Sequence, residues 1–373
     1  MKIAMLAPGG FDRSGTARVI PCLLWMVERL VKWGDEVHVF VLRQETRPGQ
    51  WPLLGASVHN AGGANPLVRG SRTLRTLRQE HRRAPFDVIH AFWAVPQGIL
   101  AGVAALGLRI PVLLHLPGGD LACLPDIAYG ARTTMKRRLA LRLAILAADR
   151  IAVPSGWMVE EAGRLGIRAE RLPFGVALDR WPVAAPRRRS SSAPAKLLQV
   201  ANLNPVKDQE TLLAAAAHLK DRGIPFLLDI VGEDTMQGKA QRRAQELGLG
   251  HNVHFRGFLP QSTLRDYVYA ADLLVVPSRH EAGPIVALEA AAAGVPVVGT
   301  RVGLLADWSP EAARTVDIGD SAALANLIAD LLSNEDQRLL LASEAQKRAI
   351  AENADVTTRA IRNAYLAMQK RRK

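Results

Sequence analysis

Cysteine and aromatic residues are scarce in this sequence. Its 373 residues contain two cysteines, Cys22 and Cys123, and aromatic residues make up 5% of the chain. Two cysteines allow at most one disulfide, and a reduced cytosolic protein is favoured. The aromatic residues are not interleaved with basic ones, which argues against the stacking surfaces that bind nucleic acid.

Long apolar runs are lacking as well. No uninterrupted apolar stretch reaches the ~18 residues that a membrane-spanning helix needs. Residues Met1–Pro8 contain one lysine and no long apolar core, unlike a secretory signal. These absences predict a cytoplasmic protein that contacts a membrane at most peripherally, on its inner face.

Acidic residues are fewer than basic ones. Thirty-five Asp and Glu residues face 48 Lys and Arg residues, which gives a formal net charge of +13. Such an excess suits nucleic acid, anionic lipid or phosphorylated substrates, and the aromatic pattern makes nucleic acid the weakest of the three. Hydrophobic residues make up 49% of the chain, enough for buried sheets, and the length predicts two domains.

The order of apolar segments predicts doubly wound α/β domains. Lys2–Ala7 is strand-like, Thr16–Trp33 has helical periodicity, and Asp35–Leu42 alternates like a strand, which is the opening of a βαβ unit. The later strand-like segments are near-continuous apolar runs, as parallel strands buried on both faces require. We therefore expect an α/β fold with parallel sheets.

A glycine-rich loop containing Gly9, Gly10 and Gly15 follows the first strand. The spacing is not the G-x-G-x-x-G of dinucleotide-binding loops. We interpret this loop as a close backbone approach to a ligand, and a plain tight turn explains it equally well. His115 ends another strand-like run, where it would face the crevice of the sheet; a structural histidine is the alternative.

A basic helix is predicted over Ala131–Ala148. Met135, Leu139, Leu143 and Leu146 form one narrow apolar stripe, and five cations occupy the other faces. A solvated helix that packs by its stripe is the main interpretation. Contact of residues 132–142 with an anionic membrane surface is the alternative.

The stretch Ser278–Thr300, SRHEAGPIVALEAAAAGVPVVGT, carries the clearest functional signal. An apolar strand leads into a loop with Glu281, Gly283 and Pro284, and the helix that follows carries Glu289. Ligands of open α/β sheets bind at the carboxyl ends of strands, and helix N-termini favour anions. Alternatively, both acids simply favour the positive end of a helix dipole.

This stretch resembles the Glu-x7-Glu motif of retaining GT-B glycosyltransferases of the family 4 type, also called glycosyl transferases group 1. The resemblance covers nearly the whole chain and is most specific over Leu197–Gly303. It implies the GT-B fold, with two doubly wound Rossmann-like domains, an inter-domain cleft and a C-terminal crossover helix. The implied domains are residues 1–178 with the returning helix 354–373, a proline-broken linker 179–195, and a donor domain 196–353.

The resemblance also implies roles for individual residues. Glu281 would bind the transferred sugar, Glu289 the ribose, and His115 would lie beside the sugar. The segment VANLNPVKD implies that Lys207 and Asn202 contact the donor phosphates, although Asn202 stands where arginine is commonest. The remaining implied donor-binding residues are Gly283, Pro284, Ile285, Arg256 and Phe258, and the implied phosphate and acceptor loop contains Gly9, Gly10 and Gly15.

The implied reaction transfers a hexosyl group from a nucleotide-diphosphate sugar to a hydroxyl acceptor with retained anomeric configuration. Glu281, His115 and Lys207 are the implied catalytic residues, and no cofactor is expected. No Asp-x-Asp sequence occurs, so we expect no metal, and Lys207 with helix dipoles would stabilise the leaving diphosphate. A GT-B sugar-nucleotide epimerase is one alternative. The other is an inactive homologue that only binds a nucleotide sugar or a membrane, because Asn202 and Phe174 depart from the family pattern.

Overall fold

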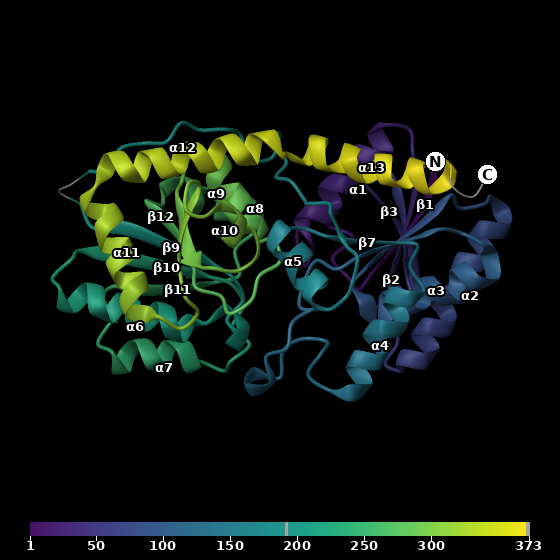
Figure 1. The fold of residues 1–373 in the computed structure, drawn as a ribbon, viewed down its shortest axis with the longest axis horizontal. Helices are drawn as coiled ribbons and strands as arrows, with labels where there is room; N and C mark the ends of the chain where they lie inside the picture. The colour runs from purple at the N-terminus through teal and green to yellow at the C-terminus, as the bar shows by residue number, and fades with distance from the viewer. Residues whose placement is uncertain (191–192, 371–373) are drawn as a thin grey trace. The chain divides into compact units, whose positions relative to one another are not determined.

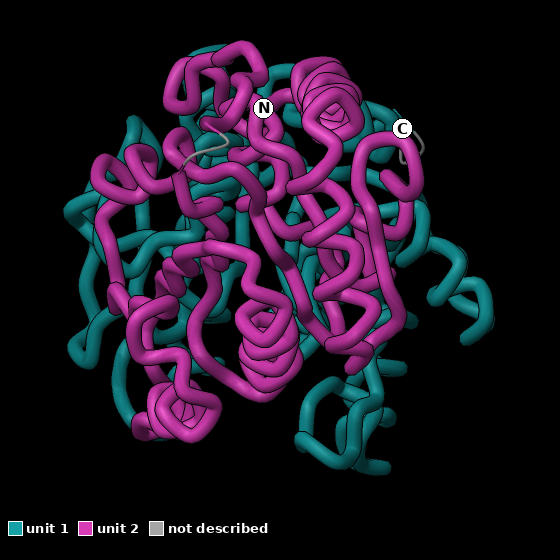
Figure 2. The backbone as a smooth tube through the Cα atoms, turned by 90° about the vertical axis from the view of Figure 1, so that its left-hand side faces the viewer, with its two compact units in different colours: residues 1–175, 354–373 teal, residues 176–353 magenta. Residues whose placement is uncertain are grey.

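The computed structural model describes residues 1–190 and 193–370 and divides into two compact units. The first comprises Met1–Gly175 and the segment that begins at Ala354, and the second is Val176–Asn353 (Figure 2). Both units are Rossmann-like α/β structures with mostly parallel sheets, which confirms the predicted fold class.

Within the described residues, the first unit contains an eight-stranded sheet in the order β3-β4-β2-β1-β5-β6-β7-β8. Only β3 runs antiparallel to its neighbour β4. The strands are β1 (Lys2–Ala7), β2 (Glu36–Val41), β3 (Gly49–Leu53), β4 (Ala56–Asn60), β5 (Val88–Phe92), β6 (Val112–His115), β7 (Arg150–Val153) and β8 (Glu170–Arg171). The strand order reverses between β1 and β5, so the carboxyl ends of these strands mark the expected ligand position.

Helices cover the sheet of the first unit (Figure 1). They are α1 (Pro21–Lys32), α2 (Pro66–Arg83), the π-helical turn η1 (Ala94–Gly98), α3 (Ile99–Leu108), the 3-10 turn η2 (Pro125–Ile127), α4 (Met135–Leu146), α5 (Gly156–Arg164) and α13 (Ala354–Lys370). All six residues of β1 are buried, as expected for a central parallel strand covered on both faces.

The last helix, α13, packs against α1 within the first unit (Figure 1). Its buried face includes Ile361, Tyr365 and Met368. On the same helix, Arg362 Nε lies 2.7 Å from Asp35 Oδ2, and that carboxylate is fully buried. Residues 371–373 of the predicted returning helix lie outside the described residues.

The second unit contains a six-stranded parallel sheet in the order β11-β10-β9-β12-β13-β14. The strands are β9 (Ala195–Val200), β10 (Phe226–Val231), β11 (Val253–Gly257), β12 (Leu273–Val276), β13 (Val297–Thr300) and β14 (Ala313–Val316). The accompanying helices are η3 (Pro205–Lys207, a 3-10 turn), α6 (Gln209–Asp221), α7 (Lys239–Glu246), α8 (Gln261–Ala270), α9 (Ile285–Ala292), α10 (Gly303–Trp308), α11 (Ser321–Ser333) and α12 (Glu335–Ala351). Here the strand order reverses between β9 and β12.

The segment predicted to be a separate linker, 179–195, is instead part of the second unit. Trp181 is fully buried, and the Ala184 N–H donates to the Ala292 carbonyl at the end of α9. The Arg187 guanidinium donates to the carbonyls of Ala270 and Ala271. The prolines and arginines that suggested a linker therefore belong to a segment that packs against the second unit. Residues 191–192 of this segment lie outside the described residues.

The structure of α4 contradicts the prediction that this helix packs by its apolar stripe. Its apolar stripe is exposed: Met135 is 76%, Leu139 61%, Leu143 52% and Leu146 73% accessible. The buried face contains Leu141 and Ala144 instead. The close packing of α4 against η1 and α3 explains why this face is buried. A Cβ at Gly98 would lie 3.1 Å from the methyl group of Ala144, and a Cβ at Gly102 would lie 2.4 Å from that of Ala147. The close approach accepts only the small side chains of α4.

No helix among residues 1–190 and 193–370 is long and apolar enough to cross a membrane.

Candidate active site

Lys207 and Glu281 meet where the strand order of the second unit reverses. Lys207 ends the turn η3 after β9, and Glu281 lies in the loop after β12. The Lys207 Nζ atom lies 2.6 Å from Glu281 Oε1. Asn204 fixes the turn, because its Oδ1 accepts a hydrogen bond from the Lys207 N–H at 3.2 Å.

Ser278 holds the same oxygen of the Glu281 carboxylate as Lys207 does. Its hydroxyl donates to Glu281 Oε1 at 2.7 Å, and the Thr300 hydroxyl donates to the Ser278 carbonyl. A Cβ on Gly303, whose φ is +53°, would lie 2.3 Å from the Glu281 carbonyl oxygen. Only glycine can therefore support the Glu281 loop at this distance.

These groups line a cavity of about 190 Å³ within the second unit. Its walls include Lys207, Glu281, Pro284 and Ile285, and Pro284 is the N-cap of α9. Gly283 directly precedes that cap. The cavity thus combines a cation, a carboxylate and the backbone donors of a helix start, groups that can bind a phosphate and a hydroxyl-rich ring.

Glu289 lies on α9 but does not line this cavity. Burial raises the pKa of its carboxyl to about 8, against the opposing effect of the Gln261 and Trp181 side chains. These two donors face Glu289 without a well-aligned hydrogen bond, since Gln261 Nε2 and Trp181 Nε1 are buried atoms that lack a partner among the described residues. The expected contact of Glu289 with ribose stays a prediction.

Asn202 has a structural partner. Its Oδ1 accepts a hydrogen bond from the Glu233 N–H at 3.1 Å, which connects the loop after β9 to the loop after β10. Between these loops, a Cβ on Gly232 would lie 2.1 Å from the Ala201 carbonyl. The asparagine therefore fastens two loops that approach very closely.

Arg256 and Phe258 lie near the carboxyl end of β11, away from the cavity. Arg256 Nε lies 2.6 Å from Asp229 Oδ1, so its charge is already paired. The Phe258 side chain is 51% exposed. The implied contact of Arg256 and Phe258 with the donor stays a prediction.

His115 ends β6 as predicted, but it is fully buried. The Phe174 ring, which replaces the family's asparagine, stacks on the imidazole at 4.5 Å between ring centroids. His115 Nδ1 lies 3.3 Å from His90 Nε2, and His90 Nδ1 lies 2.6 Å from the Tyr365 hydroxyl. Burial lowers the pKa of His115 to about 3, so the ring is neutral near pH 7, and its predicted place beside the sugar stays a prediction.

The glycine-rich loop follows β1 in the first unit. Gly10 and Gly15 have φ values of +88° and +67°, which explains their identity. Gln44 holds the loop by accepting hydrogen bonds from the N–H groups of Gly10, at 2.7 Å, and Phe11, at 3.0 Å. Gly9 has an ordinary φ and lines a large cavity.

The sequence prediction omitted two positioning residues, Ser278 and Gln44. Ser278 lies three residues before Glu281 in the motif itself, so its spacing could have revealed it. Gln44 follows β2 and carries no local signal. Among the described residues, no group of three His, Cys, Asp or Glu side chains is arranged to hold a metal ion.

Two family models match the chain. The model described as "Glycosyl transferases group 1" matches residues 185–348, and the "Glycosyl transferase 4-like domain" model matches residues 19–175. A D-inositol 3-phosphate glycosyltransferase from Acidothermus cellulolyticus is 30% identical over 342 residues, covering 82% of this chain and 76% of that protein. The chain belongs to the group 1 glycosyltransferases.

This group 1 glycosyltransferase also resembles a putative teichuronic acid biosynthesis glycosyltransferase, TuaC, from Bacillus subtilis. The two are 31% identical over 240 residues, 62% of this chain and 57% of that protein. The chain therefore matches little more than half the length of that relative.

Solved structures share the fold. Sucrose-phosphate synthase from Thermosynechococcus elongatus has a TM-score of 0.82 at 22% identity, covering 98% of both chains. The Anabaena HepE protein in complex with UDP-glucose has a TM-score of 0.74 at 19% identity, covering 98% of this chain and 100% of that one. The predicted GT-B family is confirmed, while the individual site roles stay predictions.

Proposed function

We propose that this group 1 glycosyltransferase moves a hexosyl group from a nucleotide-diphosphate sugar to a hydroxyl acceptor. The observation that carries the proposal is the pairing of Lys207 with Glu281 at the strand-order reversal of the second unit, 2.6 Å apart. A carboxylate suits sugar hydroxyls, and a lysine beside a helix N-terminus suits a diphosphate.

The reaction breaks the bond between the anomeric carbon and the diphosphate oxygen and forms a bond to the acceptor oxygen. In the retaining course that we propose, the hydroxyl proton passes to the leaving diphosphate on the same face of the sugar. Lys207 and the α9 N-terminus would stabilise the developing negative charge in the place of a metal ion. NMR of the product's anomeric configuration tests retention, and activity in excess EDTA tests metal independence.

Donor binding is the first test. The Anabaena HepE structures contain UDP and UDP-glucose, which makes UDP-glucose the first donor to try. Saturating donor should raise the melting temperature by mass action. Lys207→Met should abolish most of this shift, whereas Lys239→Met, at an exposed lysine outside the cavity, should not. The absence of a shift and of transfer with every nucleotide sugar would refute the proposal.

We further propose that the first unit binds peripherally to an anionic membrane, on the cytoplasmic face of that membrane. The exposed stripe Met135, Leu139, Leu143 and Leu146 supports contact through α4. Its flanking cations, Lys136, Arg137, Arg138 and Arg142, are all exposed. An apolar stripe bordered by cations is the pattern of helices that lie in the lipid headgroup region.

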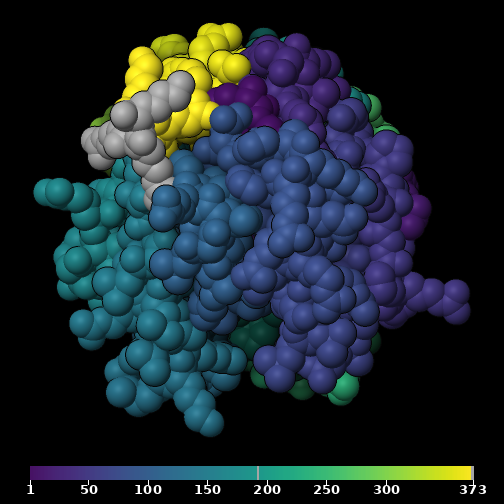
Figure 3. All heavy atoms as spheres, turned by 90° about the vertical axis from the view of Figure 1, so that its right-hand side faces the viewer, coloured from purple at the N-terminus to yellow at the C-terminus, as the bar shows by residue number. Residues whose placement is uncertain are grey.

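The charge of the neighbouring helices supports the same surface. Helices α2, α3 and α4 contact one another in sequence and contribute to the face shown from indigo to teal in Figure 3. Glu80 is the acidic residue among these three helices, and it is buried and paired with Arg83. Leu67 on α2 and Leu106 on α3, at 83% and 85%, add exposed apolar area.

Vesicle co-sedimentation tests this contact. Leu139→Ser with Leu143→Ser should weaken binding to phosphatidylglycerol vesicles by roughly tenfold, because two apolar side chains lose their burial. Leu340→Ser, at a residue of the second unit that is equally exposed (61%), is the control. Unchanged binding in the double variant, or no binding by the natural chain, would reject the membrane surface.

A further inference from the structure

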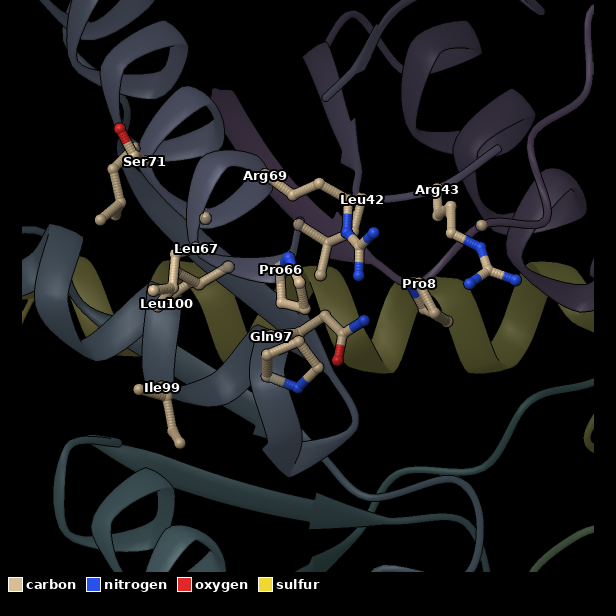
Figure 4. A pocket seen from close by; sticks show the side chains of 14 residues that line it. Pro8, Leu42, Arg43, Pro66, Leu67, Arg69, Ser71, Gln97, Ile99 and Leu100 are labelled. Atoms are coloured by element: carbon tan, nitrogen blue, oxygen red, sulfur yellow. The ribbon is translucent and has the colours of Figure 1, made fainter. Parts of the chain in front are cut away.

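A cavity of about 820 Å³ opens within the first unit (Figure 4). It lies at the carboxyl edge of the sheet, beside the residues that follow β1 and β2, and α2, η1 and α3 complete its walls. This is the edge where the strand order reverses and where doubly wound sheets bind ligands. Gly9 of the predicted acceptor loop forms part of the wall.

The walls are mainly hydrocarbon. Leu42, Leu67, Leu74, Ile99 and Leu100 line the space, together with three prolines. A sugar would leave most of its hydroxyl groups without partners against such walls, which is costly. The volume falls in the range of small-molecule sites, so the walls favour a ligand with a substantial apolar part.

One buried polar group faces this cavity without a partner. Gln97 is 2% exposed, and its Oε1 has no hydrogen-bond partner among the described residues. Figure 4 shows its amide projecting into the space between Pro66 and Pro8. An unpaired buried carbonyl costs about 1–3 kcal/mol, so a ligand that donates a hydrogen bond would offset this cost.

The segment that presents Gln97 is strained. Trp93, the residue before the π-helical turn, has φ 68° and ψ 143°, a conformation that non-glycine residues rarely adopt. Asp120 Oδ1 accepts a hydrogen bond from the Ala94 N–H at 2.9 Å and holds the turn in place. Strain of this kind concentrates at ligand-binding segments.

Two arginines give the cavity a charged side. Arg43 is exposed, and its guanidinium has no ion pair or hydrogen bond among residues 1–190 and 193–370. Arg69 is held by the carbonyls of Gly63 and Ala64, each at 2.8 Å, which fix the guanidinium without neutralising it. The lining residues include no acid, so the cavity attracts an anion.

We propose that this cavity binds the acceptor as an amphiphile, with its hydrocarbon chain against the leucines and its phosphate against Arg43 and Arg69. The identity of the ligand as the acceptor rests on the proposed function, whereas the chemistry of the ligand rests on the cavity alone. Gln97 would receive a hydrogen bond from a hydroxyl between the two parts. The cavity thereby selects a single-chain lipid phosphate over a water-soluble sugar phosphate.

Binding of dodecyl phosphate to the full chain, below its micelle concentration, tests the ligand chemistry by calorimetry. We expect saturable one-to-one binding that inositol phosphate and inorganic phosphate do not reproduce, because they lack the chain. Dodecyl maltoside, which lacks the charge, should bind at least tenfold more weakly. Equal binding of the soluble phosphates would overturn the role of the apolar walls, and equal binding of the maltoside would overturn the role of the arginines.

Variants locate the binding. Arg43→Gln should weaken dodecyl phosphate binding roughly tenfold by removing one charge-assisted contact, whereas Arg47→Gln, at a nearby exposed arginine outside the cavity, should not. Leu100→Trp should block the cavity, and Ser71→Trp does so from another helix if the first variant folds poorly. Leu139→Ser with Leu143→Ser should retain binding, and loss in that variant would place the amphiphile on the α4 surface instead.

The donor measurement separates this inference from the proposed function. Binding of UDP-glucose without binding of dodecyl phosphate would overturn the inference and leave the transferase proposal intact. Binding of dodecyl phosphate without any nucleotide sugar would support the cavity's ligand chemistry and remove its role as an acceptor site.

Discussion

In the second unit, the strands at the reversal point place the ion pair of Lys207 and Glu281 in a cavity of about 190 Å³. In the first unit, the equivalent edge carries a cavity of about 820 Å³ with apolar walls and two arginines. The two sheets have related topologies, yet the charged groups at their edges differ: an ion pair in the second unit and two cations in the first. The comparison indicates that strand order fixes where a ligand binds, while the loop residues decide its chemistry.

The two units also differ in the surroundings of their predicted catalytic side chains, Glu281 and His115. The Glu281 carboxylate accepts hydrogen bonds from the Lys207 ammonium and the Ser278 hydroxyl. His115, at the end of β6, is neutral beneath Phe174, and burial lowers its pKa to about 3. We therefore expect reaction chemistry from the second unit and binding from the first.

The largest expected effect tests that division directly. Glu281→Ala should lower kcat/KM by about 10²–10⁴-fold, because it removes the carboxylate from the proposed sugar site and leaves Lys207 unpaired. Steady-state transfer from the donor measures it. Glu233→Ala, at an exposed glutamate after β10, is the control, and an equal rate in both variants would contradict the role of Glu281.

Removing the Phe174 ring that covers His115 should have the next largest effect, which is a loss of stability. Phe174→Ala should lower the free energy of unfolding by about 3 kcal/mol, since it removes a buried ring. Water would then reach His115, and NMR titration should show its pKa rising from about 3 toward the ordinary value of 6.5.

Phe86→Ala provides the comparison for that experiment. Phe86 is buried to a similar degree in the same unit but does not stack on His115. It should cost similar stability and leave the pKa of His115 low. A histidine pKa unchanged in Phe174→Ala would show that the ring does not shield it.

The pH dependence of stability sharpens the contrast between the two glutamates of the motif. The folded pKa of Glu289, about 8, exceeds its ordinary value of 4.5, so the folded state binds the proton more tightly. This stabilisation is complete below about pH 4.5 and is lost as the pH rises through 8. Glu289→Gln cannot ionise, so its stability relative to the natural chain should increase by about 2 kcal/mol between pH 6.5 and pH 9. Chemical denaturation at both pH values measures the difference, with Glu246→Gln as an exposed control. If the stability of Glu289→Gln changed with pH in parallel with that of the natural chain, the raised pKa of Glu289 would be disproved.

The smallest effect concerns the departure from the family pattern. Asn202→Ala removes the acceptor for the Glu233 N–H and should cost about 0.5 kcal/mol, because this hydrogen bond is exposed. Asn202→Arg should lose the same stability, and donor titration shows whether it gains affinity. A more stable arginine variant would mean that the loop needs no asparagine.

The second unit's edge was predictable because its parts are adjacent in the sequence. A strand, Glu281, a helix start and Glu289 lie within one short segment, and a turn after a strand supplied Lys207. The partner of Asn202 was not predictable, since it depends on how closely two loops approach across Gly232.

Less of the first unit could be predicted from the sequence. The contacts that determine its site join residues far apart in the chain or depend on how closely helices approach. The position of His115 at a strand end was predictable, but the ring that covers it comes from residue 174. The 820 Å³ cavity draws its walls from apolar residues that are common everywhere, spread between Pro8 and Leu100. The periodicity of α4 revealed a stripe, but Gly98 and Gly102 decide which side packs.

The packing of α13 on α1 has a consequence for synthesis. The first unit needs a helix that the ribosome makes only after all of Val176–Asn353, so the second unit is the first whose complete sequence emerges. Until then, the apolar surface that receives Ile361, Tyr365 and Met368 stays uncovered, together with the His90 ring that bonds the Tyr365 hydroxyl. Nascent chains stalled before residue 354 should therefore recruit chaperones through the N-terminal unit, although that unit was translated first.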